Sequence, residues 1–212
     1  KGANISHAKQ RISNGIYLGI TEPGIIAAES PNPIVNKLVI MPDIEKRLEG
    51  FVRCGHAFVV FPGGVGTAEE ILYLLGILLN PANKDMPFPL IFTGPAESRS
   101  YFDEIDGFIA ATLGDEARSL FTIIVDDPAA VAREVKAGIK QVKRFRIENG
   151  DAFYFNWLLK IEHAFQLPFV ANHDNMRSLE LYRDMEPHEL AANLRRAFSG
   201  IVAGNVKSEA MQ

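Results

Sequence analysis

A glycine-rich turn between two apolar segments constrains the fold of this chain more than any other feature. Residues 57–61 are continuously apolar and have the length of a buried strand, and residues 71–79 form an apolar run that favours a buried helix. Between them lie residues 62–67, with the sequence PGGVGT. The sequence therefore predicts that the glycines lie on a strand-to-helix turn.

This turn is a candidate phosphate site. Glycine lets the backbone approach a ligand closely, and the first N–H groups of a helix have no acceptor within it. We predict that the N–H groups of Gly64, Val65, Gly66 and Thr67 bind a phosphate, with one more bond from the Thr67 hydroxyl; Gly63 belongs to the same turn. The structural alternative is an ordinary tight turn, which glycines also favour.

Two carboxylates, Glu69 and Glu70, follow in the first turn of the predicted helix. Thr67 and Glu70 also match a capping box, in which a threonine and the glutamate three residues later bind each other's backbone N–H groups. The pattern leaves two interpretations of Glu70 open. It either closes the helix terminus, or it is an ionised carboxylate beside the phosphate, suited to stabilising a cationic transition state.

Short strands alternate with longer helices through most of the chain. Asp43 is predicted to be the N-cap of a helix that ends near Cys54, and residues 22–33 are predicted to be a loop. The alternation indicates an α/β fold with a Rossmann-like, open and mainly parallel sheet and helices on both faces. The predicted strands are 16–20, 38–41, 57–61, 90–93 and 121–125, and the predicted helices are 6–13, 43–54, 71–79, 101–112 and 127–145.

The pattern changes after Arg146, where no strand-like alternation is evident. Residues 151–165 and 187–202 have the periodicity of amphipathic helices, with a polar linker predicted over 171–178. Phe155 and Trp157 could stack on a nucleotide base, but we expect them in the core, because aromatic residues at helical spacing usually pack there. We therefore predict a Rossmann-like domain over residues 1–146 and a C-terminal helical extension over 147–212. Because the chain opens at Lys1 in polar residues, we expect it to lack the first strand and glycine turn of that domain.

Composition and residue spacing exclude several kinds of partner and site. The 212 residues carry a formal net charge of −4, so we expect no broad basic surface and no nucleic-acid partner. The longest apolar run is too short to cross a bilayer, so we expect no membrane partner. The lone Cys54 allows no internal disulfide and fits a reducing, cytoplasmic location. The histidines lack metal-ligand spacing, so we predict neither a metal site nor a cofactor.

Residues 62–70 resemble the Pro-Gly-Gly-X-Gly-Thr-X-X-Glu signature of the LOG (lonely guy) family. That family has an arginine on the preceding helix, 23 residues before the signature glutamate, and here 70 − 47 = 23, which points to Arg47. Without the resemblance, Arg47 would be taken as part of a solvated helical face. Residues 21–29, 41–47 and 191–207 are similar to the bacterial pyrimidine/purine nucleotide 5′-monophosphate nucleosidases. Leu48 and Val65 depart from the plant-type pattern, so cytokinin specificity is not expected.

The resemblance implies an enzyme that hydrolyses the N-glycosidic bond of nucleoside 5′-monophosphates such as AMP, giving ribose 5-phosphate and a free base. It implies that Glu70 and Arg47 are catalytic, that residues 63–67 bind the phosphate and that Glu69 contacts ribose hydroxyls. It also implies a homo-oligomer, either a dimer or a tetramer. The alternative function is a non-catalytic sensor that binds a nucleotide or phosphate at the same turn.

Overall fold

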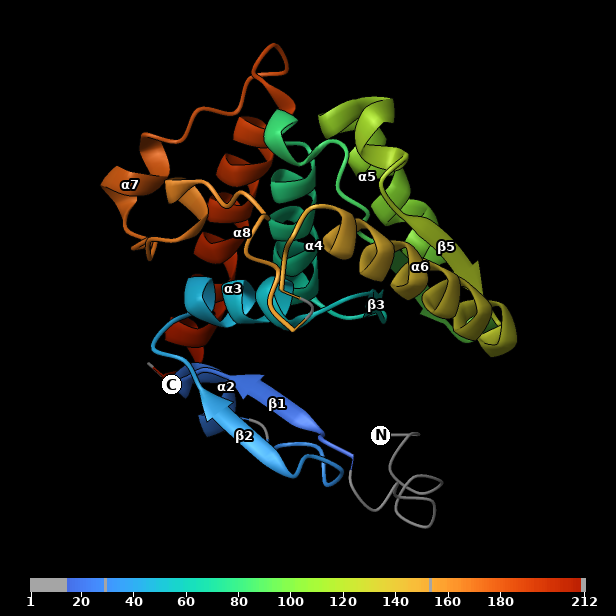
Figure 1. Ribbon diagram of the computed structural model, residues 1–212. Coiled ribbons are helices and arrows are strands. Elements are labelled where there is room, and N and C mark those ends of the chain that lie inside the picture. Colours follow the sequence, from blue (N-terminus) through green and yellow to red (C-terminus); the bar gives the residue numbers. More distant parts are fainter. Residues whose placement is uncertain (1–14, 29, 153, 211–212) are drawn as a thin grey trace. The chain divides into compact units, whose positions relative to one another are not determined.

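The computed structural model describes residues 15–28, 30–152 and 154–210 (Figure 1). By their contacts, the residues divide into two compact units, Lys1–Phe51 and Val52–Gln212, and each is described by itself below. The helix predicted over residues 6–13 lies outside the described residues. Within the described residues, no helix is both long and apolar enough to cross a lipid bilayer.

The first unit contains a two-stranded parallel sheet. Strands β1 (Leu18–Thr21) and β2 (Lys37–Ile40) pair in parallel, with Leu18 opposite Lys37 and Thr21 opposite Ile40. Both strands were predicted from the sequence, to within two residues at each end.

Two helices follow the strands of the first unit. Helix α2 (Pro23–Ala28) occupies part of the segment predicted to be a loop, so that prediction is wrong there. Proline suits the first position of a helix, where its missing N–H would have no acceptor anyway. Helix α3 (Ile44–Cys54) follows β2, and the Lys46 N–H donates to Asp43 Oδ1 at 2.8 Å, as expected for the predicted N-cap.

The second unit contains a three-stranded parallel sheet. Its strands, β3 (Phe58–Val60), β4 (Leu90–Gly94) and β5 (Thr122–Val125), lie in the order β3-β4-β5. Phe92 of the central strand lies opposite Val60 on one side and Ile123 on the other. The first three residues of β4 are buried, as expected for a central parallel strand covered on both faces.

Helices connect and flank the second sheet. Helix α4 (Val65–Leu78) links β3 to β4, α5 (Arg99–Arg118) links β4 to β5, and α6 (Pro128–Glu148) follows β5. Helix α6 contacts β4 and β5, and α5 places Phe102 against Phe92 with ring centroids 5.9 Å apart. Two parallel sheets with flanking helices confirm the predicted α/β, Rossmann-like class, although the strands form two sheets rather than the single one predicted.

Helix α4 packs along α8 (Pro187–Ala210), and the two helices run side by side in Figure 1. Almost every residue of α4 from Ile71 onward is buried, which is typical of a helix that is apolar all round. Gly76 makes this packing possible, because a Cβ at that position would overlap the Phe165 ring and lie 3.2 Å from the Ala191 Cβ. The predicted helix over 187–202 is therefore confirmed, and it belongs to the core.

The other predictions for the tail are wrong. The described residues of 151–165 contain only a short 3₁₀ helix, η3 (His163–Phe165). The predicted polar linker contains α7 (His173–Arg177). The segment before η3 is held by side chains of the core: Asn83 donates to Lys160 O at 2.8 Å and accepts from Lys160 N at 2.8 Å. Phe155 and Trp157 are 45% and 64% exposed, so their predicted place in the core is also wrong.

Candidate active site

The glycine turn lies where the sequence places it, between β3 and α4. Gly64 is the N-cap of α4, with φ −93° and ψ −154°, and Val65 is the first helical residue. The Thr67 N–H donates to Gly64 O at 3.1 Å, so its predicted direction toward a phosphate is wrong. The N–H groups of Gly64, Val65 and Gly66 precede this first bond and have no acceptor within the helix. Thr67 retains its hydroxyl as a possible ligand.

The three glycines of the turn differ in what surrounds them. A Cβ on Gly63 would overlap Thr67 Oγ1, so Gly63 makes room for the threonine side chain. A Cβ on Gly64 or on Gly66 would have no atom of the described residues within 4 Å, and both residues are exposed. None of the three has a positive φ. At Gly64 and Gly66, neither backbone strain nor protein packing therefore requires glycine, which favours the ligand interpretation over the ordinary turn.

Thr67 is not the N-cap that a capping box with Glu70 requires. A capping box would require Thr67 to be the N-cap, but α4 begins two residues earlier and its N-cap, Gly64, has no side-chain bond. The capping interpretation of Glu70 is therefore wrong. Glu70 lies one turn beyond Gly66 and is half-buried.

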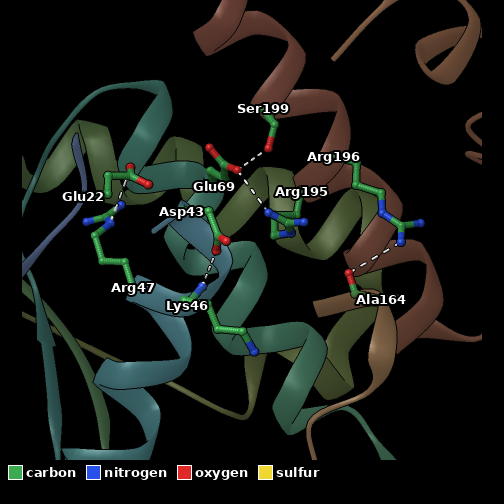
Figure 2. A network of polar contacts seen from close by, with 9 residues as sticks. All are labelled: Glu22, Asp43, Lys46, Arg47, Glu69, Ala164, Arg195, Arg196 and Ser199. Carbon is green, nitrogen blue, oxygen red and sulfur yellow. Dashed lines mark hydrogen bonds and ion pairs between the residues drawn. The ribbon is translucent and has the colours of Figure 1, made fainter. Parts of the chain in front are cut away.

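Glu69 faces the interior of the second unit. Its side chain is 1% exposed, and its Oε1 atom lies 3.3 Å from Nη1 of Arg195, which is fully buried. The Ser199 hydroxyl donates to the same oxygen (Figure 2). Both partners come from α8. The ribose contact predicted for Glu69 stays a prediction, and the structure gives this carboxylate a different set of partners.

Arg47 lies on α3 in the first unit. Its Nε atom is 3.6 Å from Glu22 Oε1 (Figure 2). Its guanidinium lies 5.6 Å from the centroid of the Phe51 ring. Arg47 is 7% exposed, so it is not part of a solvated helical face. Arg47 and Glu70 belong to different units, and their pairing stays a prediction.

Three residues beside the predicted site were missed from the sequence: Glu22, Arg195 and Ser199. Glu22 directly follows β1, and ligands of parallel sheets bind beyond the carboxyl ends of strands, which is a signal for it. Arg195 lies one helical turn after Ala191, within the apolar stripe of α8. A charged residue in such a stripe is the signal that was available. Among the described residues, no group of three or more His, Cys, Asp or Glu side chains is arranged to hold a metal ion.

Comparison with known proteins decides the family. The profile of a family described as "Possible lysine decarboxylase" matches residues 3–135, more than half of the chain. The chain belongs to this family. A second profile, described as "Pyrimidine/purine nucleotide monophosphate nucleosidase, C-terminal", matches residues 139–212. The resemblance drawn from the glycine signature is thus confirmed.

Curated relatives of this lysine-decarboxylase-like family extend the likeness over nearly the whole chain. The pyrimidine/purine nucleotide 5′-monophosphate nucleosidase of Escherichia coli strain K12 is 59% identical over 207 residues, which are 98% of this chain and 46% of the relative. The protein of the same name from Escherichia coli O157:H7 matches with the same figures. The chain therefore spans about half the length of the curated relatives it matches.

The two matched regions meet in the contact between Glu69 and Arg195. The family profile covers Glu69 and the glycine turn, and the C-terminal profile covers α8 with Arg195 and Ser199. The predicted domain boundary after residue 146 stays a prediction. Whatever the division, the C-terminal region supplies the partners of Glu69, the residue before the signature glutamate Glu70.

Proposed function

We propose that the protein hydrolyses the N-glycosidic bond of nucleoside 5′-monophosphates such as AMP, giving ribose 5-phosphate and a free base, with no cofactor. The observation that carries this proposal is the open glycine turn at the start of α4, with Glu70 in the next turn of the helix. The names of the 59% identical relatives support the same reaction.

The turn would bind the 5′-phosphate. The N–H groups of Gly64, Val65 and Gly66 lie at the positive end of the α4 dipole, which favours a dianion. The Thr67 hydroxyl, seated against Gly63, would donate one further hydrogen bond. Because Gly64 and Gly66 leave the space beside the backbone open, phosphate oxygens can approach the amides closely.

Glu70 would act on the ribose. Cleavage passes through an oxocarbenium-like state in which positive charge develops on the sugar, and a fixed carboxylate binds that state more strongly than the ground state. As the bond from C1′ to the base nitrogen breaks, water bonds to C1′ and loses a proton, and the base leaves with the electron pair and takes up a proton. Glu70 stabilises the sugar cation or orients the water, and Arg47, held by Glu22, binds the nucleotide or offsets charge on the leaving base.

The test is to incubate the purified full-length protein with AMP, CMP, GMP and UMP and to look for free base by chromatography. We expect base from at least one nucleotide, together with an equal amount of ribose 5-phosphate. Release of no base from any of them would overturn the proposal. Thermal stabilisation by AMP without turnover, unchanged in Glu70→Gln, would instead support the non-catalytic sensor.

We also propose that the protein is a cytoplasmic homo-oligomer, either a dimer or a tetramer. The support is the family resemblance, together with a single cysteine, Cys54, that allows no internal disulfide. Light scattering on the purified protein gives its mass in solution. A mass equal to one chain would contradict the assembly.

A further inference from the structure

A buried ion pair lies directly behind the candidate active site. Glu69 and Arg195 are 1% and 0% exposed, and Ser199 donates a second bond to the Glu69 oxygen that faces Arg195. Removing one partner of a buried ion pair leaves an uncompensated charge, so such pairs tend to fix a unique arrangement of the elements that carry them. Here those elements are α4, which begins at the glycine turn, and α8 of the C-terminal region.

The packing of α4 against α8 sets the register of this pair. Ala191 approaches α4 at Gly76, and Arg195 and Ser199 reach Glu69, two turns nearer the start of α4. The two helices therefore run antiparallel. Ala191, Arg195 and Ser199 are spaced four residues apart and so form one stripe on α8. Close packing at Gly76 and the ion pair at Glu69 together hold α4 along its length.

Holding Glu69 also holds Glu70. Successive residues of an α-helix are rotated by about 100°, so Glu70 cannot turn about the helix axis without pulling Glu69 away from Arg195. The same constraint acts on the amides of Gly64 to Gly66, one turn earlier. Site geometry of this kind matters, because a displacement of about 1 Å can cost about a hundredfold in rate.

The pair has an electrostatic consequence as well. Glu69 lies four residues after Val65, or about 6 Å along the helix, so its negative charge would repel a phosphate bound at the start of α4. Arg195 neutralises that charge from the side away from solvent. With Arg195 in place, the helix terminus keeps its preference for an anion.

We propose that Arg195 and Ser199 are positioning residues for the glycosidic cleavage. In this proposal the Glu69 carboxylate binds Arg195 and Ser199 and does not bind the ribose. The inference rests on the proposed function. In this arrangement α8 sets the direction of Glu70 and the charge at the phosphate site, so the C-terminal region is part of the catalytic apparatus without touching the substrate.

Steady-state kinetics of four variants with AMP test the proposal: Arg195→Gln, Arg195→Lys, Ser199→Ala and the double variant Glu69→Gln with Arg195→Gln. We expect Arg195→Gln to lower kcat by about tenfold to a hundredfold and also to raise KM, since Glu70 is misplaced and Glu69 is left charged. Arg195→Lys should bring both kcat and KM part of the way back to their wild-type values. The double variant should restore KM but not kcat, because it removes the uncompensated charge of Glu69 without restoring the position of Glu70. Ser199→Ala should lower kcat by a few fold.

Arg144→Gln is the matched control, because it removes an exposed arginine from an ion pair with Glu148 on α6. It should leave kcat and KM unchanged. Rates are expressed per folded molecule, from circular dichroism and unfolding curves, and Ser199→Ala decides the matter if the Arg195 variants do not fold. Wild-type kcat and KM per folded molecule in every folded variant would overturn the inference while leaving the proposed function intact. Release of no base by the unaltered protein would overturn the proposed function, and the inference with it.

Discussion

The glycine turn and the interface between α4 and α8 use the same residue type for opposite reasons. Gly64 and Gly66 are exposed, and a side chain there would meet none of the described residues within 4 Å. Gly76 is buried, and a side chain there would overlap Phe165. Glycine at the turn therefore leaves space for a ligand, whereas glycine at the interface leaves space for the Phe165 ring. Substitutions of these glycines should change different quantities: nucleotide turnover at Gly64 and Gly66, and the free energy of unfolding at Gly76.

The largest effect is expected for Glu70→Gln, in the first turns of α4 after the glycines. The amide keeps the size of the side chain but loses the negative charge that binds the oxocarbenium-like state. A preorganised electrostatic contact is worth about 3 to 4 kcal/mol, so kcat for AMP should fall by roughly a hundredfold or more. Initial rates of base release, expressed per folded molecule, measure this.

Glu104→Gln on α5 is the matched control for Glu70→Gln. Glu104 is an exposed glutamate outside the candidate site, so the same chemical change there should leave the rate unaltered. Equal rates for wild type and Glu70→Gln would remove Glu70 from the mechanism and would favour the sensor.

At the interface, Gly76→Ala should reduce stability. The added methyl group overlaps the Phe165 ring and crowds Ala191, and overpacking of a core typically costs about 1 to 3 kcal/mol. This loss should exceed the gain from replacing glycine in a helix. Urea unfolding monitored by circular dichroism measures the change.

Gly107→Ala gives the opposite sign and serves as the control. Gly107 is an exposed residue of α5, where a Cβ would meet no described atom within 4 Å. Alanine should stabilise that helix by about 0.5 to 1 kcal/mol. A stabilising Gly76→Ala would mean that the Phe165 ring and Ala191 do not approach Gly76 as closely as the structure has them.

Gly66→Ala should weaken binding of the nucleotide without reducing the stability of the protein. The methyl group enters space that is open in the protein alone, but a phosphate oxygen approaching the amides would meet it. We expect KM for AMP to rise about tenfold, which corresponds to about 1.4 kcal/mol, while the free energy of unfolding does not fall. Parallel measurements of initial rates and urea unfolding test both parts. A variant that is less stable but binds AMP normally would restore the interpretation of the turn as purely structural.

The difference between the two regions also explains what the sequence predicts well. The elements around the turn follow from local patterns: the apolar run before it, the glycines, and the apolar run after it, which give β3 and α4. Asp43 as an N-cap and the amphipathic helix over 187–202 are equally local signals. Each of these predictions depends on residues within a few turns of one another.

The interface depends on contacts distant in sequence, and here prediction fails. The sequence pattern predicts a helix over residues 151–165, but Asn83 binds the backbone of Lys160, 77 residues away, and thereby holds the segment in another conformation. The link from Arg195 to Glu69 spans 126 residues, and no local pattern contains it. The catalytic assignment of Glu70 depended on a family signature, because the local pattern fitted a capping box equally well until the first residue of α4 was known.

Gly64→Ser is expected to give the smallest change in stability, and it should move KM for AMP and the free energy of unfolding in ways that separate ligand binding from folding. Gly64 has the extended backbone of an N-cap, so Gly64→Ser should place a hydroxyl where it accepts a bond from the first helical N–H groups. Serine is better than glycine at this position by only a few tenths of a kcal/mol, so the free energy of unfolding should rise slightly. The same hydroxyl competes with phosphate for those N–H groups, so KM for AMP should rise although the protein is more stable.

Urea unfolding and initial rates, measured on one preparation of Gly64→Ser, give the direction of change in the free energy of unfolding and in KM. A fall in KM together with greater stability would show that these N–H groups do not bind the phosphate, because a competing hydroxyl cannot strengthen a contact that it replaces.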